Sequence, residues 1–293
     1  MSQKIKDILQ TLETGVKDLL SSDNYKQYLQ YMATFPSYSY RNSLLIYIQC
    51  RQQDFMPTLL APYREWQKRH RHVKAGQHGI AIIAPHYHKQ QKADGTEEDR
   101  LGFHIAHTFD VSQTEPDDPQ GEIPEICHRL TGSLPDENLL DVITSISPVP
   151  VKFEMIPGET NGYYDSAKCK IAVDDTNSQT QQVKTLLHEI AHCWHNMLVD
   201  NFDECPRNEK EIIAESVAYV VCMSLDVPID PSEYSFGYLV SYSCTHHEYD
   251  LSSFHANLHL IQRISNQILS DIDAKSAATI ETETDIETEI EAR

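Results

Sequence analysis

The chain has 293 residues and a globular composition, with 40% hydrophobic and 23% charged residues, which excludes a disordered or repeat protein. Its net charge of −20 is unevenly spread. Residues 1–110 hold 14 Lys/Arg and 11 Asp/Glu, so the other 10 Lys/Arg and 33 Asp/Glu lie in residues 111–293. Residues 1–110 could therefore bind a polyanion, which residues 111–293 would repel.

Helices are expected over about residues 5–20, 24–33 and 40–51, followed by a short basic helix over 64–71. Residues 80–84 and 101–109 then read as the two strands of a hairpin. The stretch 115–124 is rich in proline and acids, which predicts a linker. The N-terminal domain is thus expected to be helical with a small β-hairpin or sheet, over residues 1–114.

The second domain is expected over residues 125–272, which makes the fold class α+β overall. Its helices are predicted at about 137–145, 179–198, 207–225 and 252–271, and its strands at 149–155 and 170–174. Residues 273–293 form an acidic, threonine-rich stretch that we expect to be a disordered tail. No apolar run approaches the ~18 residues of a membrane helix, so no membrane contact is expected. Seven scattered cysteines without a CxxC pair fit a reducing cytoplasm.

The sequence His188-Glu189-Ile190-Ala191-His192 is an HExxH motif inside a predicted helix. Residues four apart share a helix face, so His188 and His192 can bind one metal ion, for which Zn²⁺ is the expected cofactor. Glu189 lies beside them as the candidate catalytic base. Ser178 and Gln181 form an S-x-x-Q capping box at the helix start. The motif therefore sits mid-helix in a segment whose apolar residues predict burial.

A third protein ligand is expected from the next helix, which offers Glu211 and Glu215 one turn apart. The arrangement resembles the third-ligand helix of glutamate-type zincins. This resemblance implies that Glu211 binds the metal and that Glu215 orients a ligand histidine. Burial alone favours Glu215 as the ligand, because apolar residues surround it. Both acids therefore stay candidates, with Glu211 preferred.

Residues 63–74 carry five Lys/Arg interleaved with Tyr63 and Trp66. Basic residues can track phosphates while aromatic rings stack on bases, as a single-strand binder requires. The residues considered as DNA contacts here and in the preceding helix are Arg41, Asn42, Trp66, Lys68, Arg69, Arg71 and Lys74.

Three segments resemble the N-terminal domain of ArdC-type antirestriction proteins: residues 40–49 (YRNSLLIYIQ), residues 66–85 and residues 109–114 (FDVSQT). The C-terminal part is similar to their zincin-like metallopeptidase half and, more loosely, to ImmA/IrrE-type peptidases. The resemblance implies that the N-terminal domain binds single-stranded DNA.

The favoured hypothesis is a DNA-binding zinc metallopeptidase of a mobile element, with an antirestriction or defence-related role and an unknown protein substrate. A strand beside the metal helix, residues 170–173, could hold an extended peptide by β-pairing. The alternative is a non-catalytic single-strand-binding protection protein with a structural zinc domain. The presence of Glu189 favours a competent site, because a structural site would not need it.

Overall fold

The computed structural model describes residues 8, 19, 22–34, 38–91, 97–117, 138–229 and 251–291. The chain divides into two units, one formed by Met1–Asp18 with Ser37–Cys127, the other by Leu19–Pro36 with His128–Arg293. The predicted helix over residues 5–20 lies almost entirely outside the described residues. Within the described part of the chain, no helix is long and apolar enough to cross a membrane.

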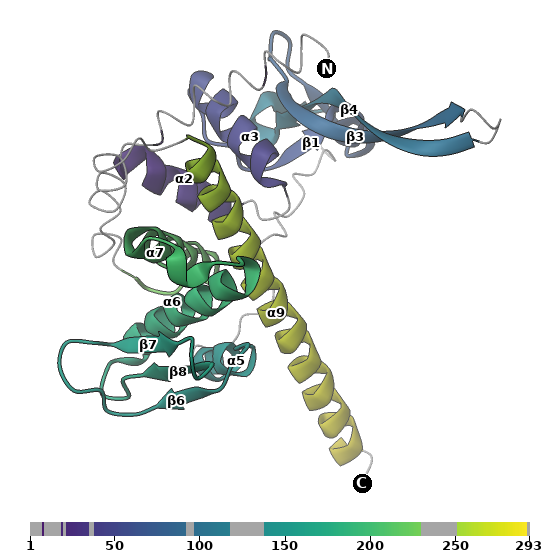
Figure 1. Ribbon diagram of the computed structural model, residues 1–293. Helices are drawn as coiled ribbons and strands as arrows, with labels where there is room; N and C mark the ends of the chain where they lie inside the picture. Colours follow the sequence, from purple (N-terminus) through teal and green to yellow (C-terminus); the bar gives the residue numbers. More distant parts are fainter. Residues whose placement is uncertain are drawn as a thin grey trace. The chain divides into compact units, whose positions relative to one another are not determined.

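The first unit combines one long helix with antiparallel strands (Figure 1). Strands β1, β4 and β3 form a sheet in that order, and β2 pairs with β5. The predicted hairpin strands are longer than expected, because residues 85–91 and 97–100 continue the β3–β4 pairing. The elements are α3 (Tyr40–Gln52), β1 (Leu60–Pro62), α4 (Tyr63–Lys68), β2 (Arg71–Val73), β3 (Ile80–Gln91), β4 (Glu97–Asp110), η1 (Val111–Gln113) and β5 (Thr114–Pro116).

Helix α3 caps the outer edge of β3 with two side-chain amides. Asn42 Oδ1 accepts from the Ile83 amide at 2.9 Å, and Asn42 Nδ2 donates to the Ile83 carbonyl at 2.9 Å. Gln49 makes the same pair of bonds to Ala81, at 2.9 and 2.8 Å. A strand edge otherwise presents unpaired backbone groups, so these amides protect β3 from pairing with another chain.

The FDVSQT segment ends β4 with a buried polar network. Asp110 is fully buried and accepts from the backbone amides of Thr58, Leu59 and Ser112, at 2.6, 3.0 and 2.9 Å. The Gln113 side-chain oxygen accepts a hydrogen bond from the Asp110 backbone amide at 2.9 Å, which completes a capping box around η1. The predicted linker starting at residue 115 is wrong at its first residues, because β5 continues to Pro116 and pairs with β2.

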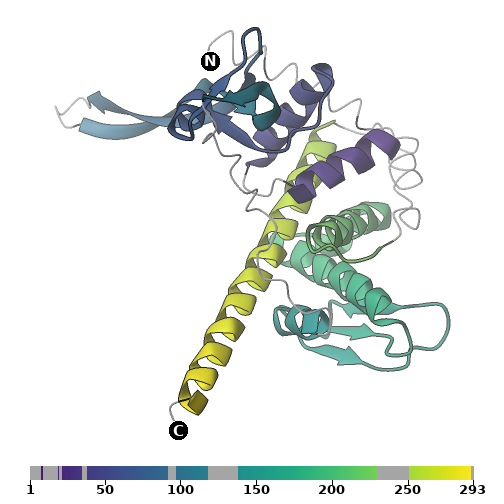
Figure 2. The ribbon, with the colours of Figure 1, turned by 180° about the vertical axis from the view of Figure 1, so that it is seen from behind.

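The second unit packs long helices against a small mixed sheet (Figure 2). Strand β8 is central, with β6 parallel on one side and β7 antiparallel on the other. The buried core comes mainly from α6, α7 and α9. Its elements are α2 (Ser22–Thr34), α5 (Leu139–Ser145), β6 (Val151–Phe153), β7 (Gly162–Asp165), β8 (Lys170–Val173), α6 (Gln179–Leu198), η3 (Phe202–Glu204), α7 (Arg207–Ser224) and α9 (Leu251–Glu291).

Two domain boundaries differ from the prediction. Helix α2 was assigned by sequence order to the N-terminal domain, but it belongs to the second unit and packs on α7. Its buried side chains include Tyr25, Tyr28 and Leu29, which need an apolar partner surface wherever the fold supplies one. The tail expected to be disordered continues α9 to Glu291. This helix contains neither glycine nor proline, the two residues that most disfavour helix.

Candidate functional site

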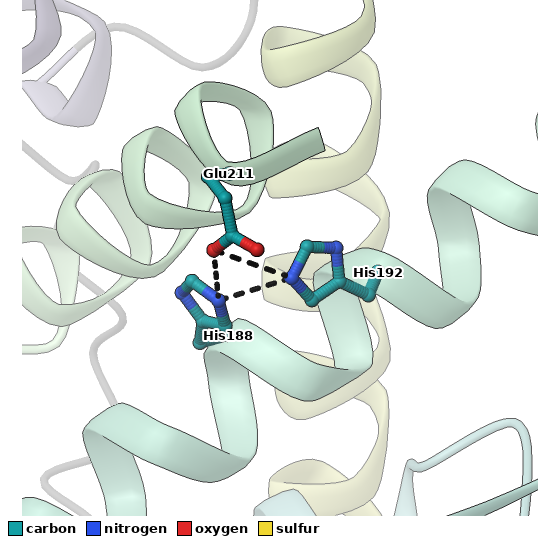
Figure 3. Close-up of side chains that lie close together, drawn as sticks. All are labelled: His188, His192 and Glu211. Carbon is teal, nitrogen blue, oxygen red and sulfur yellow. Dashed lines mark hydrogen bonds and ion pairs between the residues drawn. The ribbon is translucent and has the colours of Figure 1, made fainter. Parts of the chain in front are cut away.

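The HExxH motif lies in the middle of α6, and its two histidines point the same way (Figure 3). Ser178 caps the helix by accepting from the Gln181 amide at 3.3 Å. The Gln181 side chain bonds Thr185 at 3.1 Å within the helix. The spacing of four residues brings His188 Nε2 and His192 Nε2 to 3.0 Å from each other. Both rings therefore face one point in space.

Glu211 of α7 supplies the third donor to the same point (Figure 3). Its Oε2 lies 3.4 Å from His188 Nε2 and 3.9 Å from His192 Nε2. Glu215, one turn further along α7, instead lies 3.1 Å from the opposite nitrogen, His188 Nδ1. The two acids thus sit on opposite sides of the His188 ring, and only Glu211 converges with both histidines.

The spacing of these donors fits a metal ion. Donor atoms around a tetrahedral Zn²⁺ with bonds near 2.0–2.1 Å stand about 3.3 Å apart. The observed separations of 3.0, 3.4 and 3.9 Å bracket that value. Among the described residues this is the one group of three or more His, Cys, Asp or Glu side chains close enough to hold an ion. We call His188, His192 and Glu211 the metal cluster.

The two histidines of the cluster differ in their electrostatic surroundings. Burial alone would lower the pKa of His188, but its hydrogen bonds to Glu211 and Glu215 outweigh burial and raise the pKa to about 10. Burial and the neighbouring His188 charge lower the pKa of His192. A divalent cation would favour the unprotonated form of both rings, because metal ligation requires neutral imidazoles.

Glu189 lies on the sheet side of α6, next to β7. It is 7% exposed, and burial raises its pKa to about 7 despite the charge of His188. The Tyr164 backbone of β7 partly offsets this rise, and Glu189 Cγ lies 3.6 Å from the Cβ position of Gly162 in the same strand. A carboxylate with a pKa near neutrality suits a general base, because it can both take and release a proton.

Strand β8, predicted as a possible peptide-pairing strand, cannot serve that purpose. Its two edges are occupied by β6 and β7, so no backbone group remains for a further strand. Strands β6 and β7 are the two edges of this sheet, and β7 is the edge strand beside Glu189. The bond from the Asp174 amide to the Asn161 carbonyl at 2.8 Å sets the register, so the backbone groups of Tyr164 point away from β8. The outer edge of β7, with which no other described strand pairs, therefore carries the backbone groups of Tyr164, close to Glu189.

Gly162 allows β7 to approach α6 this closely. A Cβ atom added there would lie 2.5 Å from Thr185 Cγ2 and 2.9 Å from the Ala172 carbonyl oxygen.

We expect Gly162→Ala to lower the free energy of unfolding by about 1–3 kcal/mol, as overpacking does. Adding Thr185→Ser removes the clashing methyl and should recover part of the loss. Chemical denaturation of both variants and of Thr185→Ser alone measures this; equal stability of Gly162→Ala and the wild type would contradict it.

His195, one turn after the motif, gives a pH-dependent contribution to stability. It is 1% exposed, and burial lowers its pKa from 6.5 to about 4. The unfolded chain therefore binds more protons between these pH values, so stability should fall as the pH drops from about 6.5 to 4, by up to about 3 kcal/mol. Denaturation in EDTA across this range should show a weaker pH dependence for His195→Gln; an unchanged dependence would refute the assignment.

Three of the predicted DNA contacts have bonding partners within the first unit, which makes them weaker candidates for contacting a strand. Trp66 is fully buried and its Nε1 donates to the Phe109 carbonyl at 2.9 Å, so it cannot stack on a base. Arg71 is 5% exposed and its guanidinium donates to Thr114. Asn42 is held by the edge of β3, as described above. Burial is a tertiary property, and a basic or aromatic pattern does not reveal it.

The other predicted contacts remain on the surface. Arg41 and Arg69 are exposed, and the Arg69 guanidinium lies 5.8 Å from the centre of the Trp66 ring. The Lys68 side chain is 71% exposed and pairs with Glu65 at 2.7 Å. Lys74 is half-buried and donates to the Ser112 carbonyl at 2.9 Å.

The structure adds two residues that the sequence reasoning did not select. Tyr63 is 46% exposed at the start of α4, so it, rather than Trp66, is the aromatic ring available for stacking. Arg64 is exposed and lies four residues before Lys68, on the same helix face. Both belong to the basic stretch already recognised, and only their exposure distinguishes them.

The fold and the metal cluster define a protein made of an ArdC-type N-terminal unit and a metallopeptidase-like unit. Residues 1–122 match the family described as the N-terminal domain of anti-restriction factor ArdC, and residues 151–246 match the IrrE N-terminal-like domain of the Peptidase_M78 family. These matches confirm the predicted resemblance to ArdC-type antirestriction proteins and the predicted α+β fold class.

Among solved structures, the chain is similar to the antirestriction protein ArdC from plasmid R388, in its metal-free and its Mn(II)-bound crystal structures. Each has 16% sequence identity and a TM-score of 0.53, and the match covers 80% of this chain and 85% of that one. The chain is also 22% identical to the uncharacterized protein pXO2-81 of Bacillus anthracis, over 94% of its own length. It spans about half, 52%, of that relative.

Proposed function

We propose that the second unit is a metal-dependent peptidase and that the first unit binds single-stranded DNA, together serving an antirestriction role. The observation that carries the enzymatic part is the convergence of His188, His192 and Glu211 next to the buried Glu189. The similar R388 protein has a Mn(II)-bound crystal structure, which supports the proposal that this chain also binds a divalent metal. We propose Zn²⁺ because histidine nitrogens and a carboxylate are ligands that it favours, with Mn²⁺ as the alternative.

The residues of the chain divide the work of hydrolysis. His188, His192 and Glu211 would hold the metal, and Glu215 would orient His188 through its Nδ1 atom. A bound divalent ion would polarise the scissile carbonyl and acidify a water molecule. Glu189 would take the proton from that water and pass it to the leaving amine, as a buried carboxylate with a pKa near 7 can.

An extended peptide would lie along the free edge of β7. This edge runs beside Glu189, and backbone pairing would present a scissile bond without a strict requirement for side chains.

The protein substrate itself is unidentified, so the test uses a peptide library. The purified chain, loaded with Zn²⁺ or Mn²⁺, is incubated with the library, and new termini are found by mass spectrometry. Metal-dependent cleavage that EDTA abolishes supports the proposal, and no cleavage with either metal favours a non-catalytic role.

For DNA, we propose the exposed surface of α4 and its C-terminal end, made of Tyr63, Arg64, Lys68 and Arg69. Its side chains combine an accessible ring with three cations, and the ArdC-type match of this unit supports it. The surface replaces the contacts first chosen at Asn42, Trp66 and Arg71. Arg41 and Lys74 remain secondary candidates.

Replacing Arg64, Lys68 and Arg69 with alanine should weaken binding of an oligo(dT) strand and make it less sensitive to salt. The slope of log K against log salt should fall by about 2, because single strands contribute ~0.7 per phosphate contact. Fluorescence anisotropy at several salt concentrations measures the slope. A triple alanine variant of Lys152, Lys168 and Arg207 removes the same charge from the second unit and should keep the wild-type slope. Equal slopes for both triple variants would exclude α4.

A further inference from the structure

Helix α7 presents two different faces to its neighbours. Successive residues are about 100° apart around a helix, so Glu211 and Glu215 share the face toward α6. Ser216, about 100° from Glu215, begins a second face, and Tyr219 lies at the boundary between the two. That second face packs on α2. Any rotation of α7 that moved Ser216 would also move Glu215, its neighbour in the chain.

Three hydrogen bonds join α2 to this second face. The hydroxyls of Tyr25 and Ser216 bond each other at 2.9 Å, and both side chains are buried. Gln30 Nε2 donates to the Tyr219 hydroxyl at 3.0 Å. Near the end of α7, the Ser224 hydroxyl shares its proton between the Val220 carbonyl at 2.9 Å and the Ala33 carbonyl of α2 at 3.1 Å. The bonds span two turns of α7, so they constrain its rotation as well as its position.

Helix α2 also makes the apolar contacts of a core element. Five of its side chains are at most 3% exposed: Tyr25, Tyr28, Leu29, Tyr31 and Met32. The Tyr25 ring packs against Phe254 of α9, with 6.0 Å between the ring centres. A helix of 13 residues is marginal by itself in water, so α2 depends on this packing to form. Helix α2 thus contacts α7 and α9, which also contact each other.

We propose that α2 is a positioning element of the metal centre: it sets the rotation of α7 and so pre-organises Glu211 and Glu215 for the metal. This inference rests on the proposed metal centre. A segment that lies between the two sequence parts of the first unit is thereby part of the unit that holds the metal cluster. Tyr25 acts through Ser216 and touches no ligand of the ion.

The test measures the dissociation constant for Zn²⁺ by competition with a chromogenic chelator, on full-length protein well below its melting temperature. Tyr25→Phe removes one hydroxyl and keeps the ring, and Ser216→Ala removes its partner. Each should weaken Zn²⁺ binding about fivefold, the equivalent of one net hydrogen bond. The double variant should be no weaker than either single one, because both remove the same bond.

Tyr47→Phe is the matched control. It also removes a buried tyrosine hydroxyl, one that accepts from Arg51 Nη1 at 3.2 Å, but in the first unit. Its Zn²⁺ affinity should equal that of the wild type. Lower melting temperatures with unchanged Zn²⁺ affinity in Tyr25→Phe and Ser216→Ala would overturn the inference, because α2 would then only stabilise the fold. Failure of the wild type to bind Zn²⁺ or Mn²⁺ would instead remove the proposed metal centre, and the inference with it.

Discussion

Glu189→Gln is expected to lower metal-dependent peptide cleavage by at least about 10²-fold while leaving the metal content unchanged. The amide has nearly the shape of the carboxylate but cannot accept the proton from water. Glu189 is not part of the metal cluster, so its replacement removes no metal ligand. The measurement compares initial cleavage rates of a peptide found in the library with metal content from elemental analysis of the same samples.

Glu204→Gln is the control for this change, because it makes the same substitution at an exposed position in η3. It should retain wild-type cleavage. Full cleavage by Glu189→Gln would remove the proposed base. Loss of both cleavage and metal in Glu189→Gln would show that the residue supports the site structurally, a role that its burial beside β7 makes physically reasonable.

Alanine at His188, His192 or Glu211 is expected to remove the bound metal almost completely, from about one ion per chain to a small fraction of that. Each residue supplies one of three converging donors, and two donors hold Zn²⁺ far less tightly. Glu215→Ala should instead weaken the affinity by about 10–100-fold, as the loss of a partner that orients a ligand histidine does. Elemental analysis of protein purified without added metal, followed by chelator competition, separates the two results.

The ligand series also decides between the two acids. Greater loss of metal in Glu215→Ala than in Glu211→Ala would reverse their roles and contradict the geometry in Figure 3. His78→Ala, an exposed histidine of the first unit, is the control and should keep the wild-type metal content. Full metal in every variant would place the ion elsewhere.

The features that could be predicted from the sequence are those that depend on local geometry within one helix or strand. The pairing of His188 with His192 follows from four-residue spacing on one helix, whatever surrounds that helix. The capping of α6 by Ser178 is local in the same sense. The choice between Glu211 and Glu215 was not local, because it depends on how α7 is rotated against α6. Burial favours Glu215 as the ligand, whereas the resemblance to zincins favours Glu211.

The N-terminal unit shows the opposite case. Asn42, Trp66 and Arg71 look like nucleic-acid contacts by residue type, yet each is held by distant backbone or side-chain groups. A side chain that completes a core and one that meets a ligand can have the same identity. Tyr63 and Trp66 differ in exposure alone, 46% against 0%, and exposure is decided by packing.

The sequence by itself therefore determined the proposed metal pair, the candidate base Glu189, the order of most elements and the α+β class, because periodicity and spacing act within one element. Only the tertiary structure decided which acid completes the cluster, which cations stay exposed and that α2 belongs to the metal-binding unit. These outcomes depend on contacts between residues far apart in the chain, such as Tyr25 with Ser216, whose pairing arises only when the helices pack.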